Sequence, residues 1–149
     1  ALNIIKKSHP DIQVNFIVNP NKNADDPTLV DITKLSQIVN NLGINSTKIV
    51  SGSLLQVASL LQKQKLVLSD DGGLLHVAAT VENGPNVVGL FFPGFSNHWV
   101  LDKDKVTGIE APEGMQSFAA EWGIADESRK WINKIKPEAI ARIALEKLA

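Results

Sequence analysis

The feature that most constrains the fold is an alternation between short, β-branched apolar runs and stretches whose apolar residues recur with a helical period. This pattern is typical of a parallel sheet whose strands are joined and covered by helices. Helical crossovers between parallel strands are nearly always right-handed, so we expect an α/β fold with a Rossmann-like, doubly wound parallel sheet. There is no repeat, low-complexity segment or linker, and we predict a single domain over residues 1–149.

The element boundaries follow from local signals. The pattern predicts strands at residues 12–18, 47–50, 66–68, 86–92 and 106–109. An opening helix should stop before Pro10, and a second should run over residues 29–42 with Gly43 as its C-terminal stop. Ser51 or Ser53 should cap a third helix, whose apolar positions are Leu54, Val57, Ala58 and Leu61. A fourth should cover residues 74–81, and from residue 116 we expect helix, turn and helix, with Pro137 at the first position of the last one.

Composition excludes several classes of protein. Fifteen Lys and Arg residues against 16 Asp and Glu leave a net charge of −1, which argues against a nucleic-acid partner. The chain contains no cysteine, so it can form no disulfide, thiolate nucleophile or Cys-ligated zinc site, and this fits a cytoplasmic location. No apolar run approaches the roughly 20 residues that a membrane-spanning helix requires.

The chemistry is concentrated in one strand-to-helix turn, because ligands of open α/β sheets bind beyond the carboxyl ends of the strands. Asp70, Asp71, Gly72 and Gly73 lie between an apolar strand and an apolar helix. The glycines allow close backbone approach, and the helix-start N–H groups with the helix dipole favour a phosphate. Asp71 can cap the helix or accept a hydrogen bond from a bound hydroxyl, and His76, one turn inside, can face the same anion.

Simpler interpretations of this turn stay open. The segment can be an ordinary βα turn with an N-cap, since a diglycine turn is a weak signal. His76 taken alone is more often a satisfied helix residue than a ligand contact. Asp70 and Asp71 are adjacent and should diverge in direction, so we expect no metal site.

Residues 71–78 (DGGLLHVA) resemble the Asp-Thr-Gly-x-x-His-x-Ala motif of glycosyltransferase family 9, the heptosyltransferase type. Upstream, residues 51–61 are similar to the Gly-x-x-Ser-Leu helix of that family. Downstream, residues 85–99 resemble its Pro-Val-Val-x-Leu-Phe-Gly-Pro…Trp segment, and residues 135–140 resemble its closing Ile-Ser-Pro-Glu-x-Val helix. The resemblance covers nearly the whole chain in the family's order.

The resemblance implies the C-terminal, donor-binding half of a GT-B enzyme, which faces an N-terminal half across a cleft. It implies a glycosyltransferase that moves a heptose-like sugar from a nucleotide-diphosphate donor to a lipopolysaccharide or other glycan acceptor, which can be lipid-linked. The nucleotide sugar would be a substrate, with no separate cofactor. The parent would work in the cytoplasm, peripherally at the inner face of a bacterial membrane. Implied donor-binding residues are Asp71, Gly72, Gly73, Leu74, Leu75 and His76, with backbone donors from the two leucines, and Pro93, Gly94 and Trp99 would border the cleft.

The chain departs from the family pattern at several positions. Gly72 replaces the motif's threonine and removes a hydroxyl, and Phe92 replaces the glycine of Phe-Gly-Pro. The acidic residue that often binds the ribose would have to be Asp25 or Asp26. These departures bear directly on donor binding.

The resemblance also implies that a first, central strand lies outside these residues, beside both strand 12–18 and strand 66–68. We therefore expect another part of the parent polypeptide to supply that strand. The catalytic base belongs to the other domain of such enzymes, so we expect none here and no catalysis by this chain alone.

Two other functions remain as alternatives. The first is a non-catalytic binding or assembly module with the same fold, which Gly72 and Phe92 favour. The second is a phosphoacceptor receiver domain with Asp70 and Asp71 as its acidic pocket, but such domains place acidic residues at two strand ends, and no early pair is found.

Overall fold

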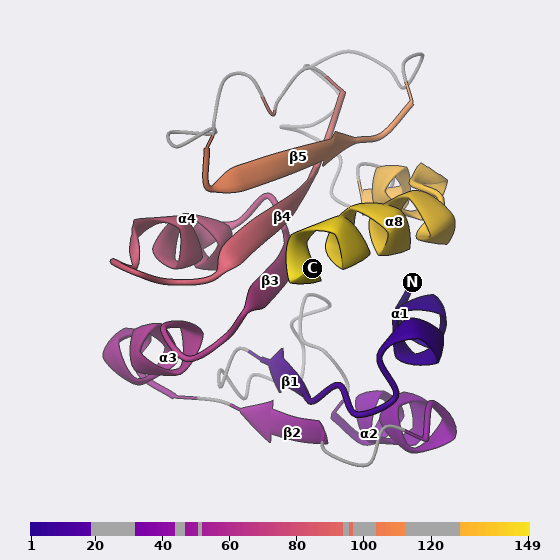
Figure 1. Cartoon of the computed structure of the whole chain (residues 1–149), viewed down its shortest axis with the longest axis horizontal. Helices are drawn as coiled ribbons and strands as arrows, with labels where there is room; N and C mark the ends of the chain where they lie inside the picture. The colour runs from indigo at the N-terminus through magenta and orange to yellow at the C-terminus, as the bar shows by residue number, and fades with distance from the viewer. Residues whose placement is uncertain (19–31, 44–46, 51, 94–95, 97–103, 113–128) are drawn as a thin grey trace. The chain divides into compact units, whose positions relative to one another are not determined.

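The computed structural model describes residues 1–18, 32–43, 47–50, 52–93, 96, 104–112 and 129–149 (Figure 1). The chain divides into two compact units, one of residues 2–59 and one of residues 60–149 together with Ala1. Each unit contains parallel strands and helices, which confirms the predicted α/β class. The single-domain organisation stays a prediction.

The first unit holds two parallel strands, β1 (Val14–Ile17) and β2 (Thr47–Val50), in register from one end to the other. Its helices are α1 (Leu2–Ser8), α2 (Ile32–Asn41) and most of α3 (Leu54–Leu61). Strand β2 has the predicted bounds, whereas β1 is shorter than residues 12–18. The predicted start of α2 at residue 29, and the acidic pair Asp25 and Asp26, lie outside the described residues.

The end of α2 confirms the predicted stop at Gly43. This residue has φ +57°, a left-handed conformation that glycine adopts without the steric cost of a side chain. Its N–H donates to the carbonyl of Asn40 at 3.0 Å, while that of Leu42 donates to Ile38 at 3.0 Å. The Lys6 ammonium, from α1, donates to the carbonyls of Leu42 (3.1 Å) and Gly43. A cation thus caps the negative end of the helix.

The start of α3 is a capping box. The Ser53 N–H donates to Oε1 of Gln56 at 2.8 Å, and the Gln56 N–H lies 3.4 Å from the Ser53 hydroxyl oxygen. Of the two predicted caps, Ser53 is confirmed, and Ser51 lies outside the described residues. Of the apolar positions of this helix, Val57 and Leu61 are buried, whereas Leu54 in the first turn is 65% exposed.

The second unit is a parallel three-stranded sheet in the order β3-β4-β5, with helices on both faces (Figure 1). Its elements are β3 (Leu66–Asp70), α4 (Gly73–Thr80), β4 (Asn86–Phe91), β5 (Val106–Glu110), the 3₁₀ helix η1 (Arg129–Lys134) and α8 (Pro137–Leu148). The predicted strands are confirmed, as is Pro137 at the start of the last helix. The helix predicted from residue 116 falls on residues 113–128, outside those described.

Alternate residues of β4 face opposite layers. Val88 and Leu90 pack in one buried cluster with Ile140 of α8. On the other face, Leu75 of α4 approaches Gly89 so closely that an added Cβ there would lie 2.6 Å from a Leu75 methyl carbon. This period-two alternation explains why the run reads as continuously apolar, since both of its faces are covered.

Strand β3 marks one side of this sheet. Within the described residues it pairs with β4 alone, and β1 pairs with β2 alone. Leu68, in the middle of β3, remains 38% exposed. The further strand expected beside strands 12–18 and 66–68 stays a prediction.

Candidate functional site

The predicted site lies at the carboxyl end of β3. The strand ends at Asp70 and α4 begins at Gly73, so Asp71 and Gly72 form the whole connection. Side chains in such a short connection are held between a sheet strand and a packed helix. This is the edge at which open parallel sheets bind ligands.

The N-cap of α4 is Gly72, in extended backbone with φ −151° and ψ 174°, and no side chain caps the helix. Of the two roles considered for Asp71, helix capping is therefore wrong: the chain turns one residue later than that role requires. The Leu75 N–H donates to the Gly72 carbonyl at 3.0 Å. The N–H groups of Gly73 and Leu74 also belong to the first turn, where N–H groups have no partner within the helix, and no side chain caps them.

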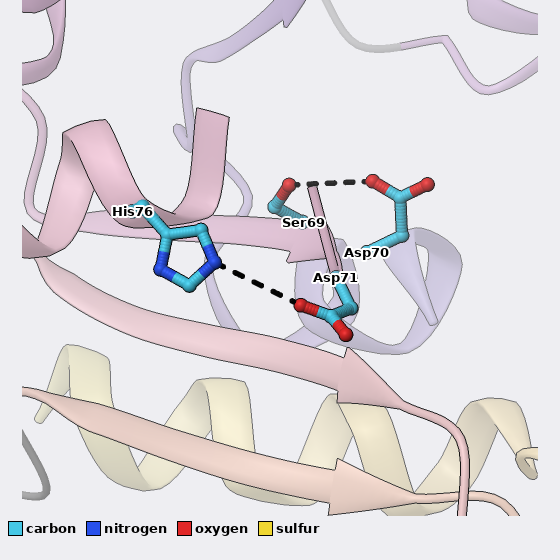
Figure 2. Close-up of polar contacts among 4 residues, drawn as sticks. All are labelled: Ser69, Asp70, Asp71 and His76. Atoms are coloured by element: carbon cyan, nitrogen blue, oxygen red, sulfur yellow. Dashed lines mark hydrogen bonds and ion pairs between the residues drawn. The ribbon is translucent and has the colours of Figure 1, made fainter. Parts of the chain in front are cut away.

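Asp71 and His76 face each other across the first turn of α4 (Figure 2). Nε2 of His76 lies 3.9 Å from Oδ1 of Asp71, and the two side chains are 37% and 24% exposed. At this distance the contact is an ion pair only when the imidazole is protonated. Both side chains remain partly open to solvent.

The electrostatics of Asp71 follow from its surroundings. Partial burial raises the pKa of the Asp71 carboxyl above its ordinary value of 3.8. His76 acts in the opposite direction and lowers that pKa, while the neighbouring Asp70 charge raises it. Ionised Asp71 is therefore incompletely compensated by its protein neighbours, and a hydroxyl donor from a ligand would stabilise it.

Asp70 is directed to another partner. Its Oδ1 lies 3.5 Å from the Ser69 hydroxyl, on the far side from His76 (Figure 2). The two adjacent carboxylates diverge, as expected for neighbouring residues. They do not converge as the acidic pocket of a receiver domain or a shared cation would require.

The two glycines of the turn are not demanded by the backbone. Neither has a positive φ, a Cβ added at Gly73 would meet nothing within 4 Å, and one at Gly72 would meet only Oδ1 of Asp70 at 3.7 Å. The two glycines are therefore not explained by a turn whose backbone only glycine can adopt. The space in front of Gly73 leaves the helix start accessible.

The remaining predicted residues behave differently. The Leu75 side chain is fully buried against β4 and belongs to the core. Pro93 is half-buried and follows β4 by two residues, so it lies at the same edge of the sheet. Gly94 and Trp99 lie outside the described residues.

A polar contact that the sequence pattern did not indicate lies at the end of β5. The Ser96 N–H donates to Oε1 of Glu110 at 3.0 Å, and the Ser96 hydroxyl donates to the same oxygen. The only available signal was an acidic residue directly after the fifth apolar run, and that signal is not specific.

The sequence model of glycosyltransferase family 9 (heptosyltransferase) matches residues 9–124, which include the whole turn from Asp70 to His76. The chain belongs to glycosyltransferase family 9. No significant match to a curated protein or to a solved structure was found. The family assignment implies a glycosyltransferase with a sugar donor and an acceptor. Among its described helices, none is long and apolar enough to cross a membrane.

Proposed function

We propose that this chain is the donor-binding part of a family 9 glycosyltransferase and that a nucleotide-diphosphate sugar binds at the start of α4. The observation that carries this proposal is the uncapped N-terminus of α4, open at Gly73, at the carboxyl edge of a parallel sheet. Backbone N–H groups and the helix dipole together favour a diphosphate at such a place. Family membership supports the sugar-transfer chemistry.

Each side chain then has a specific part. The N–H groups of Gly73 and Leu74 donate to diphosphate oxygens, while that of Leu75 remains bonded to Gly72. Asp71 accepts from a hydroxyl of the donor. His76, which faces Asp71, donates a hydrogen bond from its ring nitrogen to an oxygen of the nucleotide sugar. The near-zero net charge fits this arrangement, because backbone donors rather than a basic patch hold the anion.

Catalysis follows from positioning and charge stabilisation. As the bond from the sugar to the diphosphate breaks, negative charge grows on the leaving oxygen, and N–H groups already aimed at it stabilise that charge. We propose that the base that activates the acceptor comes from the N-terminal domain of the parent protein. We also propose a heptose-like sugar and a glycan or lipid-linked acceptor at the inner face of a bacterial membrane, in line with the family's heptosyltransferase description.

The proposal is tested by calorimetric titration of the chain with ADP, UDP and GDP and by the substitution Gly73→Ala. Alanine is favoured over glycine inside helices by about 1 kcal/mol, and Gly73 is the first residue of α4, so the variant should be at least as stable as the wild type. The added methyl group occupies the space in front of the helix start, so nucleotide binding should weaken. Glu146→Gln, an exposed carboxylate on α8, is the control that should change neither.

Two outcomes contradict the proposal. Absence of binding to all three nucleotides at millimolar concentration is the first. Unchanged binding by Gly73→Ala is the second, because it would place the nucleotide elsewhere.

A non-catalytic module is the second candidate, and one observation favours it: Gly72 stands where the family motif has a hydroxyl. A side chain fits at this position, since its Cβ would make only an ordinary contact with Asp70. Glycine at position 72 is thus not required by lack of space, and its effect is to remove a hydroxyl from the turn. Replacing Asp71 and His76 together in the parent protein separates the candidates, because a scaffold would retain its cellular function.

A further inference from the structure

We propose that Glu110 is a positioning residue for donor binding and that it acts by holding Ser96 at the ligand edge of the sheet. This inference rests on the function proposed above. Neither residue belongs to the turn between β3 and α4, and the contact joins residues 14 positions apart.

The contact fixes Ser96 through its backbone and its side chain together. The Ser96 N–H donates to Oε1 of Glu110 at 3.0 Å, and the Ser96 hydroxyl donates to the same carboxylate oxygen. Hydrogen bonds to an ionised acceptor are about twice as strong as neutral ones. One carboxylate oxygen therefore holds Ser96 through its backbone and through its side chain.

Gly108 limits Ser96 from another side. A Cβ added at Gly108 would lie 2.7 Å from Cβ of Ser96, closer than side chains approach in folded proteins. The same Cβ would lie 3.4 Å from Cδ2 of the fully buried Phe91. Glycine at this place in β5 thus leaves the room that Ser96 occupies, and Glu110 holds it there.

The strand register places this contact on the donor side of the sheet. Glu110 pairs with Phe91 at the end of β4, and Asp70 pairs with Leu90 of the same strand. All three strands are parallel, so Ser96 and the Asp71–His76 turn share the carboxyl edge. Two strand spacings separate β5 from β3, about 10 Å. A sugar nucleotide whose diphosphate lies at α4 and which extends toward β5 reaches Ser96, whose hydroxyl oxygen can accept a hydrogen bond from a hydroxyl of the nucleotide while its own proton goes to Glu110.

The fold does not depend on this contact. Glu110 is exposed, whereas β5 is held by its buried residues Val106 and Ile109 and by its pairing with β4. Substitution of Glu110 should therefore lower the melting temperature only slightly and alter the position of Ser96. This separates a positioning role from a structural one.

The test measures dissociation constants of ADP, UDP and GDP for the full chain and its variants. Glu110→Ala removes the acceptor and should weaken binding of the preferred nucleotide by about tenfold, as expected for hydrogen bonds to a charged group. Glu110→Gln keeps an oxygen acceptor at the same position and should bind within about threefold of the wild type. Glu146→Ala removes the exposed carboxylate that pairs with Arg142 on α8 and serves as the matched control.

Gly108→Ala is an independent second variant. It leaves Glu110 intact, but its methyl group displaces Ser96, so nucleotide binding should weaken as in Glu110→Ala. Unchanged binding in both variants overturns the inference while the proposed function stands. Equal weakening by Glu110→Gln and Glu110→Ala also overturns it, because charge would then act directly. A wild-type chain that binds none of the nucleotides overturns the proposed function itself.

Discussion

At the scale of single residues, Asp71 is the group whose environment most affects the site. Burial raises its carboxyl pKa above 3.8, and the opposing influences of His76 and Asp70 act on the same charge. The folded state therefore binds more protons than the unfolded chain between 3.8 and the raised pKa. Over that window the free energy of unfolding falls as pH rises, and above it the Asp71 contribution is constant.

The opposing effects of His76 and Asp70 on the Asp71 pKa are tested by NMR titration of the Asp71 carboxyl carbon in the wild type, His76→Ala and Asp70→Asn. In the wild type the midpoint should lie above 3.8. In His76→Ala it should lie higher still, because the ring that lowers the pKa is gone, and in Asp70→Asn it should lie below the wild-type value. An Asp71 midpoint that is the same in all three proteins contradicts this account.

For Asp71→Asn, the linkage has a definite sign. The variant lacks the cost of ionising a partly buried carboxyl, so its stability relative to the wild type should improve as pH rises from below 3.8 through the window. Chemical denaturation at a series of pH values measures this difference.

At the scale of elements, helix ends explain most of the agreement between pattern and structure. The C-terminus of α2 depends on Gly43 and on a cation from α1, and the N-terminus of α3 depends on the Ser53–Gln56 capping box. These signals are local in sequence, apart from Lys6, which lies 36 positions from Leu42. Helix α4 differs because a glycine occupies its N-cap and no side chain caps its start.

Lys6→Met tests the distant cap. The variant keeps the apolar stem but loses the ammonium that donates to the carbonyls of Leu42 and Gly43, so it should be destabilised by about 1 kcal/mol. Lys7→Met, at the next and exposed position of α1, is the control and should change stability little. Denaturant unfolding of both variants gives the comparison, and equal midpoints would show that the cap contributes nothing.

At the scale of the whole molecule, the strand edges are the notable feature. Within the described residues β3 has a strand neighbour only in β4, and its central Leu68 is 38% exposed. Natural edge strands are commonly blunted by lysine, proline or a bulge, and β3 contains neither lysine nor proline. A strand of this kind favours pairing with a further strand.

We therefore expect the 149-residue chain to self-associate as its concentration rises, through the edge of β3. Leu68→Lys places a charge on that edge and should shift the association to higher concentration. Leu55→Lys, at a more exposed leucine on α3, should have a smaller effect because no strand edge is involved. Sedimentation velocity over a concentration series measures this, and a wild-type chain that stays monomeric throughout contradicts it.

The sequence by itself determined the α/β class, the strands and the turn that carries the candidate site, because each of these depends on neighbours close along the chain. A glycine that accepts a positive φ, a proline at a helix start and a period-two apolar run are local facts. The contact between Asp71 and His76 also depends on nearby sequence, because one short connection and one helical turn bring the two side chains together.

Only the tertiary structure decided which of the expected groups are available to a ligand. It showed that the Leu75 N–H and side chain are already engaged, that Asp71 does not cap α4, and that Glu110 holds Ser96. These facts depend on which strands lie side by side and in which register. Strand order and register are set by packing across the sheet, which brings together residues that are far apart along the chain.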